Sequence, residues 1–298
     1  MNLFLNILEI ASILVGACII IICVISCIEN RRLTVTEYRV RDFLIPEAFD
    51  AYHIVQISDL HNASYGQRNE RLIGEVAKCK PDIILITGDV IIGKPDTDVL
   101  FAADTVNQLA KIAPVYFSMG NHELRVKEYP DIYSDMWQQF VSHLSPEIHL
   151  LLDREETIER DNAILRLYGL NLTTDLYRRW IRTSMSPDYL TALFGEADPN
   201  AYHIFMAHNP DYFDEYAAWG ANLTFSGHVH GGMIRLPFFG GLVSPMISFF
   251  PKYDKGLFRI GQKIMILSGG LGNHTFKFRV NNLPEIISVF LYHERENE

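Results

Sequence analysis

Side chains that can bind metal ions are concentrated in five short segments of this sequence. Asp carboxylates, His imidazoles and an Asn carbonyl suit borderline divalent ions such as Mn²⁺, Zn²⁺ or Fe, and the set contains no thiolate. A carboxylate at Asp89 could bridge two ions at roughly 3.5 to 4 Å separation, the geometry that holds the attacking and leaving oxygens of a phosphoryl transfer. The segments are Asp59-Leu60-His61, Gly88-Asp89-Val90, Gly120-Asn121-His122-Glu123, His208-Asn209-Pro210 and Gly227-His228-Val229-His230.

Each of these segments follows a run of β-branched and aromatic residues that predicts a strand. In α/β domains, ligands bind where loops leave the carboxyl ends of strands. Any one short motif arises easily by chance. Five motifs in a fixed order, all at strand ends, are hard to obtain by accident. The predicted strands that deliver them cover residues 53–58, 82–87, 114–118, 203–206 and 223–225.

Amphipathic stretches between the strands predict helices, so the chain is expected to form a mixed α/β domain. Residues 69–78 and 97–111 each present apolar side chains on one helical face. Ser186 is predicted to cap a helix that has Pro187 in its first turn. Two packed sheets with helices outside are expected. Further strands are predicted at 35–40, 148–152, 155–159, 164–170, 256–260, 263–267 and 286–291.

The ordered motifs resemble those of the calcineurin-like metallophosphoesterases, and the chain is similar to the membrane-anchored bacterial branch of that family. The similarity covers about residues 33–292 and includes the segments that begin at Ala207, Gly227, Ser268 and Leu283. It implies a four-layer α/β/β/α sandwich that hydrolyses phosphoesters with two divalent metal ions. Val229 and Met233 depart from the family pattern, which has Thr and Gln there. Neither is an expected ligand, so they affect the pocket shape and therefore the substrate.

The resemblance also implies a role for each site residue. His122 would stand outside the metal shell and act as general acid or transition-state donor, while water activated by the ions would be the nucleophile. One ion would be bound by Asp59, His61, Asp89 and His230, and the other by Asp89, Asn121, His208 and His228. Apart from the resemblance, Arg125 is the nearest basic residue after the block Gly120–Glu123, and it would contact a phosphate or lie on a helix surface.

The first thirty residues differ from the rest of the chain. Residues 10–28 carry no charge and are long enough to cross a bilayer as one helix, which needs about 20 apolar residues. We expect a single-pass anchor over 1–30 and a catalytic domain over 31–298. A cleaved signal peptide is disfavoured because no basic residue precedes the apolar run. Acylation of Cys27 is a third reading. Basic residues after the segment favour a cytoplasmic domain but leave the side of the membrane open.

Charge and the apolar segments bear on the substrate and partners. A net charge of −10 disfavours a nuclease that neutralises nucleic-acid phosphates. The apolar stretch 236–253 is either a loop lining the core or a lip beside the metals that meets lipid. We therefore expect the substrate to be a phosphodiester or pyrophosphate of a membrane or envelope component, either a phosphorylated small molecule or a lipid-linked one. No obligate protein partner is expected. The alternative is an inactive metal-binding scaffold or sensor on the same fold.

Overall fold

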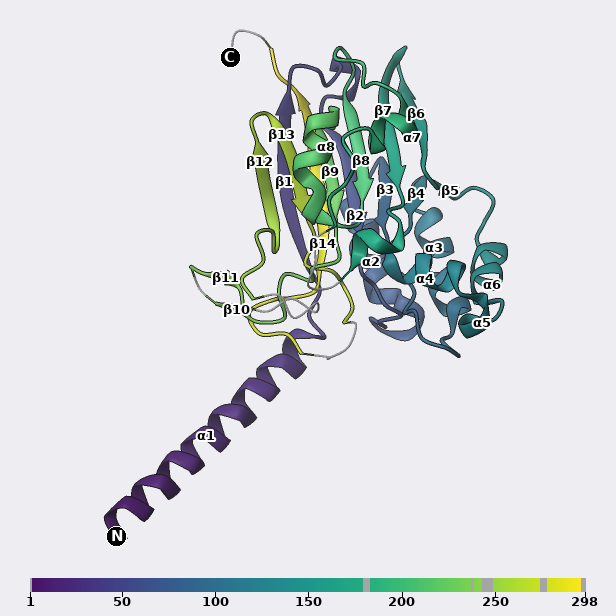
Figure 1. Cartoon of the computed structure of the whole chain (residues 1–298). Coiled ribbons are helices and arrows are strands. Elements are labelled where there is room, and N and C mark those ends of the chain that lie inside the picture. The colour runs from purple at the N-terminus through teal and green to yellow at the C-terminus, as the bar shows by residue number, and fades with distance from the viewer. Residues whose placement is uncertain (1, 179–182, 237, 243–248, 274–277, 296–298) are drawn as a thin grey trace.

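The structure, a computed structural model, consists of one long helix and a two-sheet domain (Figure 1). It describes residues 2–178, 183–236, 238–242, 249–273 and 278–295. Helix α1 (Asn2–Glu29) projects away from the domain with most of its apolar side chains exposed. At about 1.5 Å per residue its length exceeds the roughly 30 Å of a bilayer's hydrocarbon core. Among the described residues, the segment Phe4–Glu29 is the one helix long and apolar enough to span a membrane.

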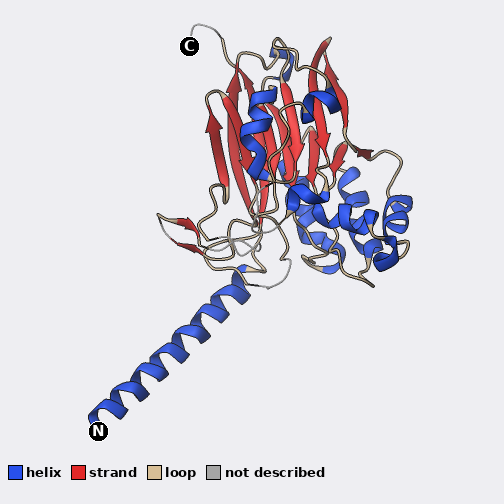
Figure 2. Ribbon diagram, viewed as in Figure 1, coloured by secondary structure: helices blue, strands red, loops and turns tan. Residues whose placement is uncertain are grey.

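Two six-stranded sheets form the centre of the domain (Figure 2). The first sheet has the order β1 (Thr34–Asp42), β14 (Glu285–His293), β2 (Tyr52–Ile57), β3 (Ile83–Thr87), β4 (Val115–Ser118) and β5 (His149–Leu150). The second has the order β12 (Gly256–Ile260), β13 (Lys263–Leu267), β9 (Leu223–Ser226), β8 (His203–Ala207), β7 (Ala163–Leu170) and β6 (Arg154–Arg160).

The direction of the strands places the site at the end of the sandwich that carries α1. Strand β1 follows α1 directly, and β14 runs parallel to β1. Strand β2 is antiparallel to β14, while β3 and β4 are parallel to β2. The carboxyl ends of β2, β3 and β4 therefore lie at the end of the first sheet where α1 leaves the domain (Figure 1).

Helices cover the outer faces of both sheets. Helices α2 (Glu70–Cys79), α3 (Val99–Ala110), α4 (Asn121–Glu128), α5 (Pro130–Tyr133) and α6 (Met136–His143) follow strands of the first sheet. Helices α7 (Tyr189–Phe194) and α8 (Phe213–Trp219) belong to the second. The short 3-10 helices are η1 (Glu47–Phe49), η2 (Gln67–Asn69), η3 (Thr174–Tyr177) and η4 (Pro210–Tyr212), and β10 (Arg235–Leu236) pairs with β11 (Gly240–Gly241) in a separate hairpin.

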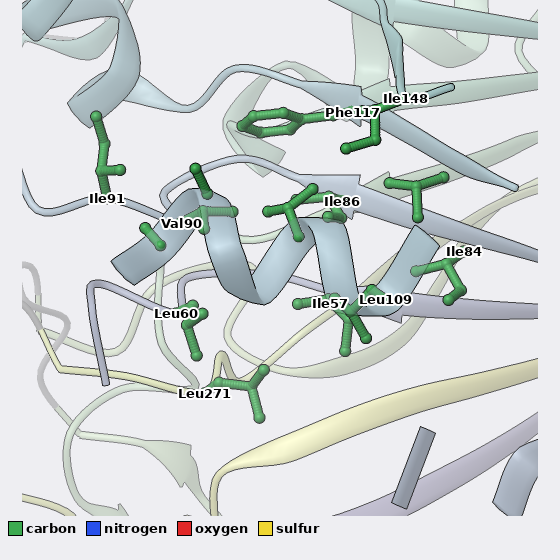
Figure 3. Close-up of a cluster of buried hydrophobic side chains, with 14 of the residues drawn as sticks. Ile57, Leu60, Ile84, Ile86, Val90, Ile91, Leu109, Phe117, Ile148 and Leu271 are labelled. Carbon is green, nitrogen blue, oxygen red and sulfur yellow. The ribbon is translucent and has the colours of Figure 1, made fainter. Parts of the chain in front are cut away.

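Alternating side chains along the strands build three apolar layers. Ile54 and Leu85 face the second sheet, where they meet residues such as Met206. Ile57 and Ile86 point to the opposite side and pack with Leu109 of α3 (Figure 3). A third layer lies outside the second sheet, where Phe205 of β8 meets Leu190 of α7 and Tyr216 of α8. Successive side chains of a strand point to opposite faces, and both sets are apolar here, so both faces of each sheet are buried.

The expected α/β fold is confirmed, with differences in detail. Helices α4, α5 and α6 lie outside the predicted elements, because each is eight residues or shorter and too short for an apolar period to be recognised in the sequence. The predicted cap at Ser186 is wrong. Helix α7 begins at Tyr189 after Asp188, and Ser186 instead accepts a turn hydrogen bond through its carbonyl. The strand expected at 148–152 is shorter, and covers His149–Leu150.

Candidate metal centre

The residues proposed as ligands occupy tight turns directly after their strands. Asp59 and His61 follow β2 with φ of 52° and 45°, and Asp89 follows β3 with φ of 55°. His228 and His230 follow β9 with φ of 74° and 53°. Non-glycine residues rarely adopt this left-handed conformation, and such strained residues cluster at functional sites. Three separate turns therefore hold five side chains in strained but defined directions.

One group of side chains gathers around Asp59. The Nε2 atom of His230 lies 3.2 Å from Asp59 Oδ1, and the Nε2 atoms of His61 and His230 are 3.1 Å apart. These three buried residues place one ligand atom each within 4.8 Å of the others. An N,N,O set of this kind suits a borderline divalent ion.

A second group gathers around Asp89 and includes His208 and His228. The Nε2 atom of His208 is 3.1 Å from Asp89 Oδ2, and the His208 and His228 rings are 5.2 Å apart. The same carboxylate oxygen lies 3.7 Å from His61 Nε2, which belongs to the first group. Asp89 therefore stands between the two groups, the position expected of a bridging carboxylate.

Backbone carbonyls orient two of the imidazoles. His208 donates from Nδ1 to the carbonyl of Thr87 at 2.6 Å, and His230 donates from Nδ1 to that of Gly272 at 3.2 Å. In the neutral form of each ring this leaves a lone pair on Nε2, which is directed at the carboxylates. Partners of this kind fix the tautomer of a metal-binding histidine.

Asn121 has a buried amide oxygen and stays the predicted fourth ligand of the second ion. It is the first residue of α4, and its Oδ1 atom is buried without a hydrogen-bond partner among the described residues. A buried acceptor without a partner costs free energy unless an ion or water satisfies it. This atom and the two histidine-carboxylate groups fit a pair of divalent ions.

His122 lies beside the first group and is held by the backbone. Its ring stands 4.7 Å from that of His61, and its Nδ1 accepts a hydrogen bond from the N–H of Gly93 at 2.6 Å. Because Nδ1 accepts, the proton of the neutral ring lies on Nε2, which can donate. The His122 backbone N–H also donates to Asp89 Oδ1 at 2.8 Å. His122, His61 and Asp89 are also close enough to one another to bind one ion. The role of His122 as a proton donor outside the metal shell therefore stays a prediction.

Arg125 lies on α4, one turn beyond Asn121, and is half-buried. Its predicted phosphate contact stays a prediction.

Charge in the centre favours cation binding. Burial would raise the pKa of both carboxyl groups, but His230 and His208 hold the pKa of Asp59 below its usual range, and His208 and His122 do the same for Asp89. Burial lowers the pKa of His228 to about 3, assisted by the charge of His208. Burial acts against protonation of His208 too, but Asp89 and Asp59 raise its pKa to about 10. A divalent ion would replace the proton of His208 as the positive charge that balances the carboxylates of Asp59 and Asp89.

Glycines permit the close approach of the turns. A Cβ on Gly120 would lie 2.2 Å from Asp89 Oδ1, and one on Gly227 would lie 2.3 Å from Asp59 Oδ2. Any other residue at these positions would displace a carboxylate from the centre.

Tyr177 is a site residue that the sequence analysis missed. It ends η3, and its ring lies 5.3 Å from that of His228 and 6.2 Å from that of His208. Its hydroxyl is buried and has no hydrogen-bond partner among the described residues. Asn209 donates from its side chain to the carbonyl of Leu176, which holds η3 against the turn after β8. No metal-ligand pattern marks a tyrosine, so only its position reveals it.

Four other histidines have partners outside the metal centre. His53 bonds Ser288, and His203 bonds the carbonyl of Asp198. The side chains of His143 and His149 pair with carboxylates near the surface. By its place after Gly272 and Asn273 in the sequence, His274 could reach the centre from a loop, but it lies outside the described residues.

Comparison with known proteins agrees with this geometry. Residues 52–232 match the model of the calcineurin-like phosphoesterase family, so the chain belongs to that family of metal-dependent phosphate ester hydrolases. The family is generally dinuclear, and the two side-chain groups, one around Asp59 and one around Asp89, are in keeping with that.

Three relatives illustrate the range of this family. The chain is 29% identical over 265 residues to the uncharacterized metallophosphoesterase YkuE of Bacillus subtilis, covering 87% of this chain and 85% of that protein. It is 26% identical over 213 residues to the phosphodiesterase YaeI of Escherichia coli, covering 71% of each. It is 22% identical over 294 residues to the UDP-2,3-diacylglucosamine pyrophosphatase LpxG of Chlamydia trachomatis, covering 81% of this chain and 85% of that protein.

Proposed function

We propose that the chain hydrolyses a phosphodiester or pyrophosphate at a dinuclear metal centre. The observation that carries the proposal is the place of Asp89, whose Oδ2 lies 3.1 Å from His208 Nε2 and 3.7 Å from His61 Nε2. One ion would be held by Asp59, His61, Asp89 and His230, and the other by Asp89, Asn121, His208 and His228. The ions, as Mn²⁺, Zn²⁺ or Fe, would polarise the phosphoryl group and lower the pKa of a water molecule.

The protein residues would bind and orient the substrate and donate a proton to its leaving oxygen. His122 would donate the proton on its Nε2 to the leaving oxygen, because its Nδ1 already accepts a hydrogen bond from the N–H of Gly93. Tyr177 would offer its buried hydroxyl to a phosphoryl oxygen. Both donors are fixed before substrate binds, which lowers the reorganisation needed in the transition state.

Helix α1 supports a membrane or envelope substrate. We propose residues 1–30 as a single-pass anchor and residues 31–298 as the catalytic domain. The carboxyl ends of β2, β3 and β4, which carry Asp59, Asp89 and Asn121, lie at the anchored end of the domain. YaeI is named as a phosphodiesterase, and LpxG as a pyrophosphatase of a diacylated sugar nucleotide. A phosphoester at the membrane surface would meet the centre without leaving the lipid.

The test uses the full chain in detergent, stripped of metal and then supplied with Mn²⁺. Hydrolysis of bis-p-nitrophenyl phosphate should require the metal and fall at least about a thousand-fold in Asp89→Asn, which loses the bridging carboxylate. Asp104→Asn is the matched control, because Asp104 pairs with His143 near the surface. Two bound ions without turnover of this diester, of p-nitrophenyl phosphate or of a pyrophosphate would favour the inactive scaffold instead.

A further inference from the structure

Large apolar side chains are exposed around the β10–β11 hairpin. Phe238 is 105% exposed and Phe239 is 75% exposed, and Phe249 and Phe250 are exposed by more than half. The N–H of Phe250 bonds the carbonyl of Leu242, so the second pair of phenylalanines lies beside the end of β11. Soluble surfaces rarely gather apolar groups in this way unless they bind a partner. We call Leu236, Phe238, Phe239, Phe249 and Phe250 the aromatic tip.

The aromatic tip is joined to α1 by one short segment of chain. Val280 bridges Ile234, and its carbonyl accepts from the N–H of Arg235 at the start of β10. The neighbouring Arg279 donates its N–H to Ser26 of α1 at 2.9 Å. Asn282 donates its N–H to Glu29, also of α1, at 3.2 Å. Figure 1 shows the hairpin beside the point where α1 leaves the domain.

The same segment contacts the metal centre. The side chain of Asn282 donates to the carbonyl of His230 at 2.7 Å and to that of Gly232 at 3.3 Å. The turn that carries His228 and His230 continues directly into Ile234 and β10. Hydrogen bonds made by the segment 279–282 therefore fix the end of α1, the aromatic tip and the turn of two proposed ligands relative to one another.

We propose that the aromatic tip inserts into the membrane that holds α1 and is a second lipid contact beside the metal centre. Phenylalanine side chains at the level of the anchor's last turn would enter the boundary between head groups and acyl chains. Arg31 and Arg32 are exposed at the end of α1, where anionic head groups would attract them. The proposal rests on the proposed membrane anchoring and deepens the proposed function, because it identifies the substrate as an amphiphile whose phosphate lies at the membrane surface.

The first test measures depth in the membrane with the full chain in vesicles of phosphatidylethanolamine and phosphatidylglycerol. Phe238→Trp is the reporter, and lipids brominated on their acyl chains quench a tryptophan that enters the bilayer. Phe43→Trp is the control: Phe43 is 49% exposed and follows the far end of β1, about 30 Å from the anchored end at roughly 3.3 Å per residue. Val15→Trp reports on α1 itself. Signals are taken as differences from the parent chain, which has three tryptophans.

We expect bromine to quench more than half of the added emission at positions 15 and 238 and almost none at position 43. Quenching at 15 alone would overturn the proposal while leaving the anchor in place. A blue-shifted but unquenched signal at 238 would mean that a second protein chain covers the aromatic tip, which also overturns it. Absence of quenching at both 15 and 238 would overturn the anchoring as well. None of these readings depends on activity, so failure of the proposed hydrolysis is detected separately.

A second test compares two substrates in the same vesicles. Phe238→Ser combined with Phe239→Ser should raise KM about ten-fold for a phosphodiester carried on a lipid and leave hydrolysis of bis-p-nitrophenyl phosphate unchanged. Phe43→Ser should change neither. An equal loss on both substrates would show that the aromatic tip only supports the fold.

Discussion

The carboxylate of Glu123 accepts a hydrogen bond from the backbone N–H of Asp89 at 2.7 Å. The same carboxylate accepts from the N–H of Gly120 at 2.9 Å and from that of Ile91 at 3.0 Å. Glu123 is fully buried, so these three donors are its main compensation for the loss of water. It ties the turn after β3 to the turn after β4 and fixes the backbone of the proposed bridging ligand.

Replacing Glu123 by Gln should weaken metal binding about 10 to 100-fold, the usual effect of removing a partner that orients a ligand. The Gln amide would turn an N–H₂ group toward N–H donors, so at least one of the three bonds is lost. Titration of metal into the stripped chain measures the effect. Glu128→Gln on the exposed end of α4 is the control and should bind metal normally. Unchanged metal affinity in Glu123→Gln would show that the turns after β3 and β4 keep their conformation without the Glu123 carboxylate.

His122→Asn should lower kcat about 10² to 10⁴-fold, as expected for loss of a general acid. Metal content distinguishes the two roles that the geometry allows. A donor outside the metal shell can be removed with both ions retained, whereas loss of one ion per chain would identify His122 as a ligand and contradict the assignment. Elemental analysis of the purified variant, alongside kcat, provides the answer.

Tyr177→Phe should lower kcat/KM about 10 to 100-fold, because a hydrogen bond to a charged oxygen contributes about 1.5 to 3 kcal/mol. The ring would stay packed against His228, so the melting temperature and metal content should not change. Tyr202→Phe is the control, since that hydroxyl is also buried but lies in the core between the sheets. Equal activity of Tyr177→Phe and the parent chain would remove Tyr177 from the substrate site.

Gly120→Ala should destabilise the domain by about 1 to 3 kcal/mol and impair metal binding, because the new Cβ collides with the Asp89 carboxylate and backbone. Gly74→Ala tests the same substitution without a collision. No described atom lies within 4 Å of its Cβ, and it sits in the middle of α2, so a gain of about 0.5 to 1 kcal/mol is expected. Thermal unfolding of both variants gives the comparison.

Arg279→Met should lower the melting temperature by roughly 5 to 10 °C, since several buried carbonyls lose their donor. The Arg279 guanidinium is fully buried and donates to the carbonyls of Gly269, Gly270, Gly272 and Asn282. Because Gly272 also orients His230, metal affinity should fall with stability. Exposed Arg259 lies on β12, and Arg259→Met should leave both quantities unchanged. A melting temperature equal to that of the parent chain would contradict this role.

Local sequence determined the strands, the long apolar helix and the residues that follow each strand. A short run of apolar, β-branched and aromatic residues is a local property of the sequence, and Asp59, Asp89 and His208 come within two residues of the end of such runs. The parallel order of β2, β3 and β4 then brings their carboxyl ends to one edge, so the ligand types and their order were sufficient to predict a metal centre.

Tertiary structure alone decided how those residues are supported and what lies around them. Ser26 and Arg279 are 253 positions apart in the chain, and the contact between them follows from the parallel pairing of β1 with β14, which no local pattern encodes. The same holds for Tyr177 beside His228. By composition, the four phenylalanines of the aromatic tip could line a core or face outward equally well. Their exposure depends on whether another element covers them, and that is a property of the assembled fold.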